Sequence, residues 1–173
     1  MKHDELRRLT LGAALAALTC VATMVIRLPS PLGGYFHLGD GLVLLCGLTM
    51  GPLWGACAAG IGSAAADLLS GFGIYAPATL VIKALTAWTA AMLLRRLPDK
   101  LGLPVGAVAG ELVMAAGYFL FELVLYSPAA AAENLLVTNL PQGAVGAVTA
   151  VLLYGILQKA HLLRYLGKTE VRS

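Results

Sequence analysis

The segment from Pro104 to Tyr126 reads PVGAVAGELVMAAGYFLFELVLY, and it decides the fold. Glu111 and Glu122 are its only charged residues, and it exceeds the roughly 20 apolar residues that carry a helix across a bilayer. The whole chain of 173 residues is 59% hydrophobic and 12% charged, against roughly 25% charged in a typical soluble domain. The sequence therefore predicts an all-α, polytopic membrane protein that forms one domain over residues 1–173.

Outward from this segment, proline, glycine and basic residues divide the rest of the chain into further apolar segments. Their expected ranges are Leu9–Leu28, Asp40–Met50, Leu53–Leu69, Pro77–Leu94 and a last segment that ends near Leu157. The last segment begins either near Asn134 with a kink at Pro141, or at Pro141 as a first-turn proline. The chain is expected to cross the bilayer six times, or five times if the second and third segments form one broken unit.

The positions of the basic residues favour six crossings. Ten of the twelve lie before the first segment, between the fourth and fifth, or after the last, namely Lys2, Arg7, Arg8, Arg95, Arg96, Lys100, Lys159, Arg164, Lys168 and Arg172. Cytoplasmic loops of membrane proteins carry the excess of Lys and Arg. Six crossings place all ten on that side, with both termini cytoplasmic, and we expect a multi-pass protein of a prokaryotic cell membrane. The net charge of +3 is thus explained by topology and indicates no nucleic-acid partner.

Polar side chains inside the apolar segments are the candidates for function. A charge at the bilayer centre costs about 2.5–3.5 kcal/mol on insertion scales, so such residues usually face a bundle interior or a pathway. In the six-crossing topology most of them fall toward the outer face, where they would form a substrate site: His37, Asp40, Asp67, Tyr75, Lys83, Tyr118, Glu122, Asn139 and Gln142. Glu111 falls in the inner half and is expected to stand apart from them, in helix packing or at a partner contact.

Two structural alternatives remain open for these residues. Asp40 could serve as the N-cap of the second segment. Asp67 and Lys83 lie at similar depth on consecutive segments, so they either bind a ligand or pair with each other. No metal site is expected at His37, because no second His or Cys lies at ligand spacing. The sequence also has no Walker-type phosphate loop and no common hydrolase motif, so neither an enzyme nor a resident cofactor is expected.

The first segment carries small residues at helical spacing, at Gly12, Ala13, Ala16 and Ala17. Faces of the small-xxx-small type let helices approach closely in lipid. We interpret this face as a surface for a partner subunit.

Several stretches together resemble the substrate-binding S components of energy-coupling factor (ECF) vitamin transporters. They are GYFHLGD at 34–40, LTMGPLWG at 48–55, GSAAADLL at 62–69, Tyr75-Ala76-Pro77 with Lys83 further along, and Asn139 followed by Gln142-Gly143. The similarity extends over nearly the whole chain and is greatest to the riboflavin-, hydroxymethylpyrimidine- and pyridoxine-type members.

The resemblance implies a six-helix bundle that captures a small vitamin or precursor at its outer face. It also implies a coupling membrane subunit and two ABC-type ATPases as partners, with an Ala-x-x-x-Ala face contacting the coupling subunit. Ala13 and Ala17 fit that pattern, as do Gly12 and Ala16. Two other functions stay open: a stand-alone proton-coupled carrier that uses Glu111 and Glu122, and an intramembrane enzyme that uses Asp40 and Asp67.

Overall fold

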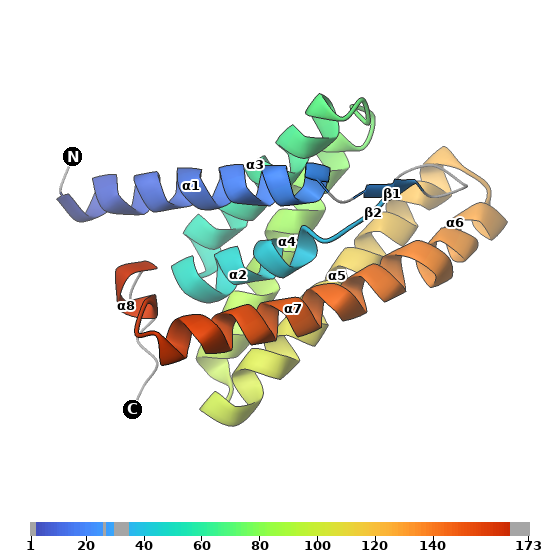
Figure 1. Ribbon diagram of the computed structural model, residues 1–173. Coiled ribbons are helices and arrows are strands. Elements are labelled where there is room, and N and C mark those ends of the chain that lie inside the picture. Colours follow the sequence, from blue (N-terminus) through green and yellow to red (C-terminus); the bar gives the residue numbers. More distant parts are fainter. Residues whose placement is uncertain (1–2, 26, 30–34, 167–173) are drawn as a thin grey trace.

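A computed structural model describes residues 3–25, 27–29 and 35–166, and nearly all of them are helical (Figure 1). The elements in chain order are α1 (His3–Val25), β1 (Arg27–Pro29), β2 (Tyr35–His37), α2 (Asp40–Met50), α3 (Pro52–Leu69), α4 (Ala76–Arg96), α5 (Asp99–Leu125), α6 (Pro128–Asn134), the π-helical turn η1 (Leu135–Asn139), α7 (Leu140–Lys159) and α8 (Leu163–Leu166).

Four helical stretches within the described residues are long and apolar enough to cross a membrane. They are Glu5–Val25, Ala76–Arg96, Lys100–Leu125 and Pro128–Lys159, the last formed by α6, η1 and α7 together. Helix α2 has 11 residues, which gives a length of about 16 Å against a hydrocarbon core of about 30 Å. The all-helical membrane fold is therefore confirmed, whereas the number of crossings stays a prediction that depends on α2 and α3.

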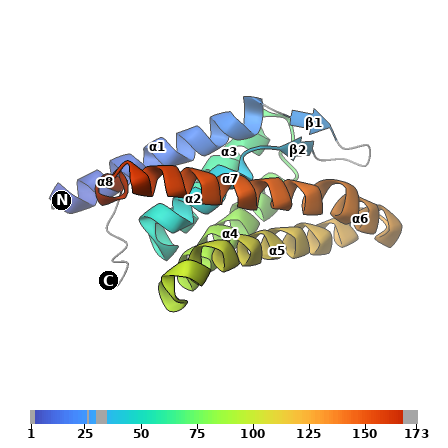
Figure 2. The same cartoon turned by 60° about the horizontal axis from the view of Figure 1, so that its bottom comes forward.

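Helix α2 lies at the centre of the bundle, where it packs against α1, α3, α4 and α7 (Figures 1 and 2). Leu44 and Leu48 of α2 are completely buried. The backbones of α2 and α4 touch, because a Cβ added to Gly47 would lie 2.1 Å from the carbonyl oxygen of Ala87. Since α2 is central, its first residue, Asp40, is buried inside the protein.

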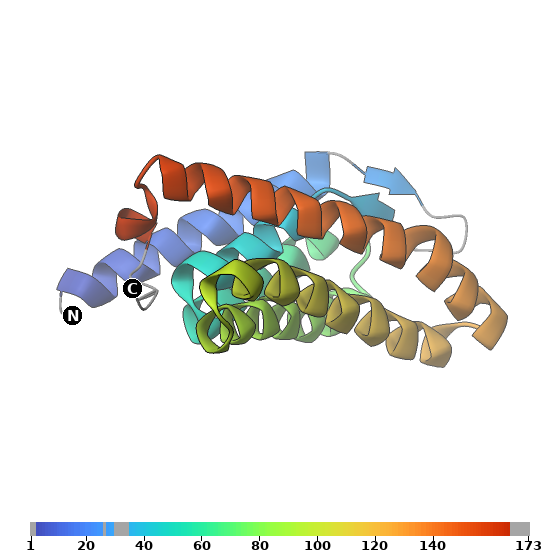
Figure 3. The same ribbon diagram turned by 90° about the horizontal axis from the view of Figure 1, so that it is seen from below.

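Basic residues mark one end of the bundle. The guanidinium of Arg7, near the start of α1, donates to the carbonyl oxygen of Tyr165 in α8 at 2.7 Å. Gly51, between α2 and α3, lies against Arg95 at the end of α4, since a Cβ there would be 2.3 Å from its guanidinium nitrogen. Figure 3 shows the start of α1, α8 and the junction of α4 and α5 toward one end, with the β1–β2 hairpin and α6 at the other.

The structure differs from the sequence prediction at the end of the first segment. Helix α1 ends at Val25, not Leu28, and Arg27–Pro29 pairs antiparallel with Tyr35–His37. The prolines of this region explain the difference, because a proline has no backbone N–H to continue a helix but is tolerated in an edge strand.

The structure also resolves where the last segment starts. The helix already begins at Pro128, and the π-helical turn lies directly before α7, whose first turn contains Pro141. Extra residues per turn accommodate a proline that cannot donate to the preceding turn.

Candidate functional site

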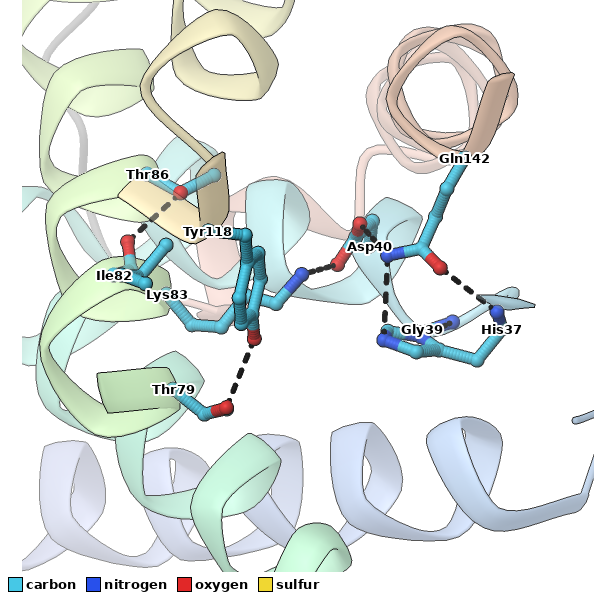
Figure 4. Close-up of polar contacts among 9 residues, drawn as sticks. All are labelled: His37, Gly39, Asp40, Thr79, Ile82, Lys83, Thr86, Tyr118 and Gln142. Carbon is cyan, nitrogen blue, oxygen red and sulfur yellow. Dashed lines mark hydrogen bonds and ion pairs between the residues drawn. The ribbon is translucent and has the colours of Figure 1, made fainter. Parts of the chain in front are cut away.

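A buried ion pair joins α2 and α4. The Nζ of Lys83 donates to Oδ1 of Asp40, and both side chains are fully buried (Figure 4). The same Nζ lies 5.2 Å from the centre of the Tyr118 ring, a cation–π contact. The N-cap of α2 is Gly39, and no side chain caps it. Asp40 is therefore the ion-pair partner of Lys83, in place of Asp67, and the N-cap alternative for Asp40 was wrong.

Gln142 connects this ion pair to the β1–β2 hairpin. Its Nε2 donates to Oδ2 of Asp40 at 2.8 Å, and its Oε1 accepts from the backbone N–H of His37 at 2.9 Å. The N–H of Gly39 donates to Nδ1 of His37 at 3.0 Å. One side chain of α7 thus links the hairpin to the buried pair, as Figure 4 shows.

The His37 imidazole is neutral. Burial lowers its pKa to about 4; the nearby Asp40 carboxylate opposes this shift, and the Lys83 ammonium adds to it. The ring nitrogen Nδ1 accepts a hydrogen bond from the N–H of Gly39, and Nε2 lies 3.4 Å from the amide nitrogen of Gln142.

Glu111 lies close to the ion pair, which corrects the expectation that it stands apart. A Cβ added to Gly146 of α7 would lie 2.7 Å from Cβ of Asp40 and 2.7 Å from Oε1 of Glu111. Only 5% of Glu111 is exposed, and neither carboxyl oxygen has a hydrogen-bond partner within the described residues. The depth assigned from the sequence assumed that the second segment starts at the surface. Because α2 starts inside the bundle, Asp40 is deeper and meets Glu111.

One narrow cavity of about 30 Å³ lies between the hairpin, the end of α3, the start of α4, the end of α5, and the stretch from α6 to the start of α7. Its lining consists of His37, Asp67, Tyr75, Thr79, Tyr118, Glu122, Asn134, Thr138, Asn139 and Gln142. Seven of the nine residues proposed from the sequence line it, and the other two, Asp40 and Lys83, lie behind it as the ion pair.

Three lining residues were not singled out from the sequence: Thr79, Asn134 and Thr138. Asn134 holds Glu122, since its Nδ2 donates to Oε1 of that carboxyl at 2.6 Å. The available signal was Asn134 itself, which follows Glu133 after the four alanines of α6. The sequence alone did not place Asn134 at the site. The turn between α5 and α6 brings α6 back alongside α5, and this puts Asn134 next to Glu122.

Tyrosine side chains form the aromatic part of the wall. The hydroxyl of Tyr118 shares a hydrogen bond of 2.9 Å with Thr79, and the hydroxyl of Tyr75 donates to Tyr126 at 3.2 Å. Tyr75 packs edge-on against Phe121, with ring centres 5.3 Å apart. Aromatic surfaces with a few placed polar groups are typical of small-molecule sites.

The small-residue face of α1 separates into two pairs. Ala16 packs inward, because a Cβ on Gly62 of α3 would lie 2.4 Å from its carbonyl oxygen. Ala13 and Ala17 are exposed. A groove of about 220 Å³ runs beside this face, lined by Leu9, Gly12, Ala13, Ala16, Trp54, Cys57, Ala58 and Ile61.

Comparisons with known proteins agree with this architecture. A solved structure described as the S component of a bacterial ECF transporter superposes with a TM-score of 0.68 over 91% of this chain and 98% of its own, at 23% identity, so it has the same fold. An uncharacterized protein of Pyrococcus woesei, from a gap 3' region, is 37% identical over 112 residues, which are 64% of this chain and 75% of that relative.

The family comparison covers more of the sequence. Residues 4–159 match the model of the family described as ECF-type riboflavin transporter, S component. This match includes every element that lines the cavity. The chain therefore belongs to the family of ECF-type riboflavin transporter S components.

Proposed function

We propose that this protein is the substrate-capture subunit of an ATP-driven ECF importer and binds a small water-soluble vitamin or precursor at its outer face. The observation that carries the proposal is the convergence of polar side chains on one cavity. They come from β2, from α3 to α7 and from η1. A binding site for a water-soluble ligand in a membrane protein needs such a cluster. Polar and ionisable groups are costly inside a membrane protein, and they usually mark a functional site.

The orientation follows from the two ends of the bundle. The cavity lies at the end that holds the hairpin and α6, away from Arg7, Arg95 and their basic neighbours. With the basic end in the cytoplasm, the chain crosses the cell membrane six times, both termini are cytoplasmic, and the cavity faces outward.

The cavity is smaller than the proposed ligand, so the ligand can bind only if the cavity widens. A volume of about 30 Å³ holds about two water molecules, whereas a vitamin ring is several times larger. Ligand binding in this proposal therefore moves the hairpin or α6 outward. Both are short elements, and the hairpin contacts α7 through Gln142.

Transport needs a partner in this proposal. The sequence has no Walker-type loop, so ATP hydrolysis comes from two ABC-type ATPases that act through a coupling membrane subunit. The exposed pair Ala13 and Ala17 is the proposed contact for that subunit. As a transporter subunit, the chain has no catalytic activity of its own.

A direct test is ligand binding by the isolated chain. The purified full-length protein is placed in nanodiscs and examined by native mass spectrometry with riboflavin, pyridoxine and hydroxymethylpyrimidine. We expect one bound molecule per chain for at least one compound, without any ATPase present. Binding only after the ATPases and coupling subunit are added would contradict a capture role.

A further inference from the structure

Glu111 is a buried carboxyl in the middle of a helix that is long enough to span the membrane. It lies near the centre of the 27-residue helix α5, roughly 20 Å from either end of that helix. Only 5% of the residue is exposed. The surrounding stretch, Lys100–Leu125, is apolar enough to cross a bilayer. The carboxyl is therefore far from the water on both sides of the membrane.

This carboxyl has no donor. Neither of its oxygens has a hydrogen-bond partner among the described residues. It faces α7 where that helix has glycines, since a Cβ added to Gly143 would lie 3.4 Å from Oε2, and one added to Gly146 would lie 2.7 Å from Oε1. An ionised carboxylate buried without a donor or a counter-charge is strongly unfavourable. A buried polar group without a partner in a folded protein indicates that something else occupies the site.

The charges around Glu111 do not balance if it is ionised. Asp40 of α2 and Lys83 of α4 are the charged side chains that act on it within the described part of the chain, and they are already paired with each other. The nearby imidazole of His37 is neutral, because burial lowers its pKa to about 4. An ionised Glu111 would place two carboxylates and one ammonium in the same buried region.

A metal cation does not suit this place. The described residues contain no group of three or more His, Cys, Asp or Glu side chains that could hold a metal, and the Lys83 ammonium would repel a cation beside Asp40. The titratable groups further along α5, Tyr118 and Glu122, each have a hydrogen-bond partner of their own. A proton on Glu111 removes the negative charge and requires no further ligand.

We propose that Glu111 is a proton-binding site in the core, and that its proton leaves Lys83 to pair with Asp40 alone. Loss of the proton would make a second carboxylate compete for the one ammonium at the start of α2. This inference concerns the core behind the cavity and is independent of the proposed capture function.

Infrared spectroscopy of the full chain in nanodiscs tests the proposal directly, because a protonated carboxyl and a carboxylate absorb at different frequencies. We compare the native protein with Glu111→Gln at neutral pH. The difference spectrum should show the loss of one carboxylic acid band and no loss of carboxylate bands. Glu133→Gln is the matched control at an exposed position of α6, and it should show the loss of carboxylate bands instead.

The pH dependence of unfolding gives a second test. An exposed glutamate loses its proton above about pH 4.3, so the unfolded chain is ionised at Glu111 where the folded protein keeps the proton. The folded protein then binds one more proton, and its stability falls as pH rises. Relative to Glu111→Gln, the folding equilibrium constant of the native protein should fall about tenfold per pH unit between about pH 5 and 7. Both proteins contain His37, so its contribution cancels. The measurement is reversible unfolding by urea in detergent micelles.

Glu111→Met keeps the test decisive if the Gln variant does not fold. It replaces a neutral side chain without a partner by an apolar one of similar length, so it should unfold at the native urea concentration or above it. Three results would overturn the proposal: loss of carboxylate bands in Glu111→Gln, a stability ratio that does not change with pH, or failure of both variants to fold. An ionised Glu111 would leave the capture function in place, and absence of ligand binding would leave the proton site in place.

Discussion

Lys83 and Asp40 pair where α4 passes the first residue of α2, and both side chains are buried. The pair fixes the start of the short central helix α2. A buried ion pair adds little net stability, because desolvation offsets the attraction, but removal of one partner leaves a buried charge.

Replacement of Lys83 by Met should destabilise the protein by about 3–5 kcal/mol, because Asp40 loses its counter-charge. The double variant Asp40→Asn with Lys83→Met should recover part of that loss. The measurement is the free energy of unfolding in detergent micelles. Lys100→Met is the control, since Lys100 is exposed and such changes usually stay within about 0.5 kcal/mol. Equal stability of the Lys83 and Lys100 variants would show that the pair does not form.

Gln142→Leu should loosen the hairpin. The substitution removes the acceptor of the His37 N–H and the donor to Asp40, at a cost of about 1–3 kcal/mol for the buried groups left without partners. Amide hydrogen exchange at His37 should become faster than in the native protein. Gln158→Leu, at an exposed position of the same helix, should leave the exchange rate of the His37 amide unchanged. An unaltered exchange rate in the Gln142 variant would rule out the connection.

Acid should weaken the packing of His37. Burial lowers its folded-state pKa from 6.5 to about 4, so the unfolded chain binds the proton first as pH falls. The stability from the neutral ring is present above pH 6.5 and is lost toward pH 4, roughly 3 kcal/mol in all. His37→Asn keeps an acceptor for the Gly39 N–H without titrating, so the difference in unfolding free energy between native and variant should shrink over this range. A constant difference would contradict the assignment.

Gly47→Ala should disrupt the contact between α2 and α4. The new methyl group would lie 2.1 Å from the Ala87 carbonyl oxygen, and overpacking of this kind costs about 1–3 kcal/mol or more. Gly155→Ala is the matched control in α7, where an added Cβ meets nothing within 4 Å. The melting temperature should drop clearly for Gly47→Ala and should stay unchanged for Gly155→Ala. Equal melting temperatures would mean that the two helices are further apart.

The helical segments were predictable because glycine and proline mark their ends. The range expected for the second segment, Asp40–Met50, is that of α2, and the third segment begins one residue earlier than expected, at Pro52. Both lie around the Gly51-Pro52 break, where a glycine at positive φ and a first-turn proline impose a boundary.

The depth of side chains was less predictable. The depth of each side chain was derived by counting residues from the end of its segment, on the assumption that this end lies at the protein surface. Helix α2 does not meet this assumption, because its first residue, Asp40, is buried. This error separated Glu111 from Asp40 and suggested Asp67 as the partner of Lys83. The hairpin was also missed, since three-residue strands carry almost no periodic signal.

Transport by the reconstituted protein tests the central claim most directly. Proteoliposomes containing the chain alone, or the chain with coupling subunit and two ATPases, are supplied with the ligand that binds in nanodiscs. The capture account predicts uptake only in the complete assembly with ATP, and no change when the proton gradient is collapsed. Uptake by the chain alone that stops on collapse of the gradient would contradict it, and would assign the buried carboxyl of Glu111 to a proton-coupled carrier instead.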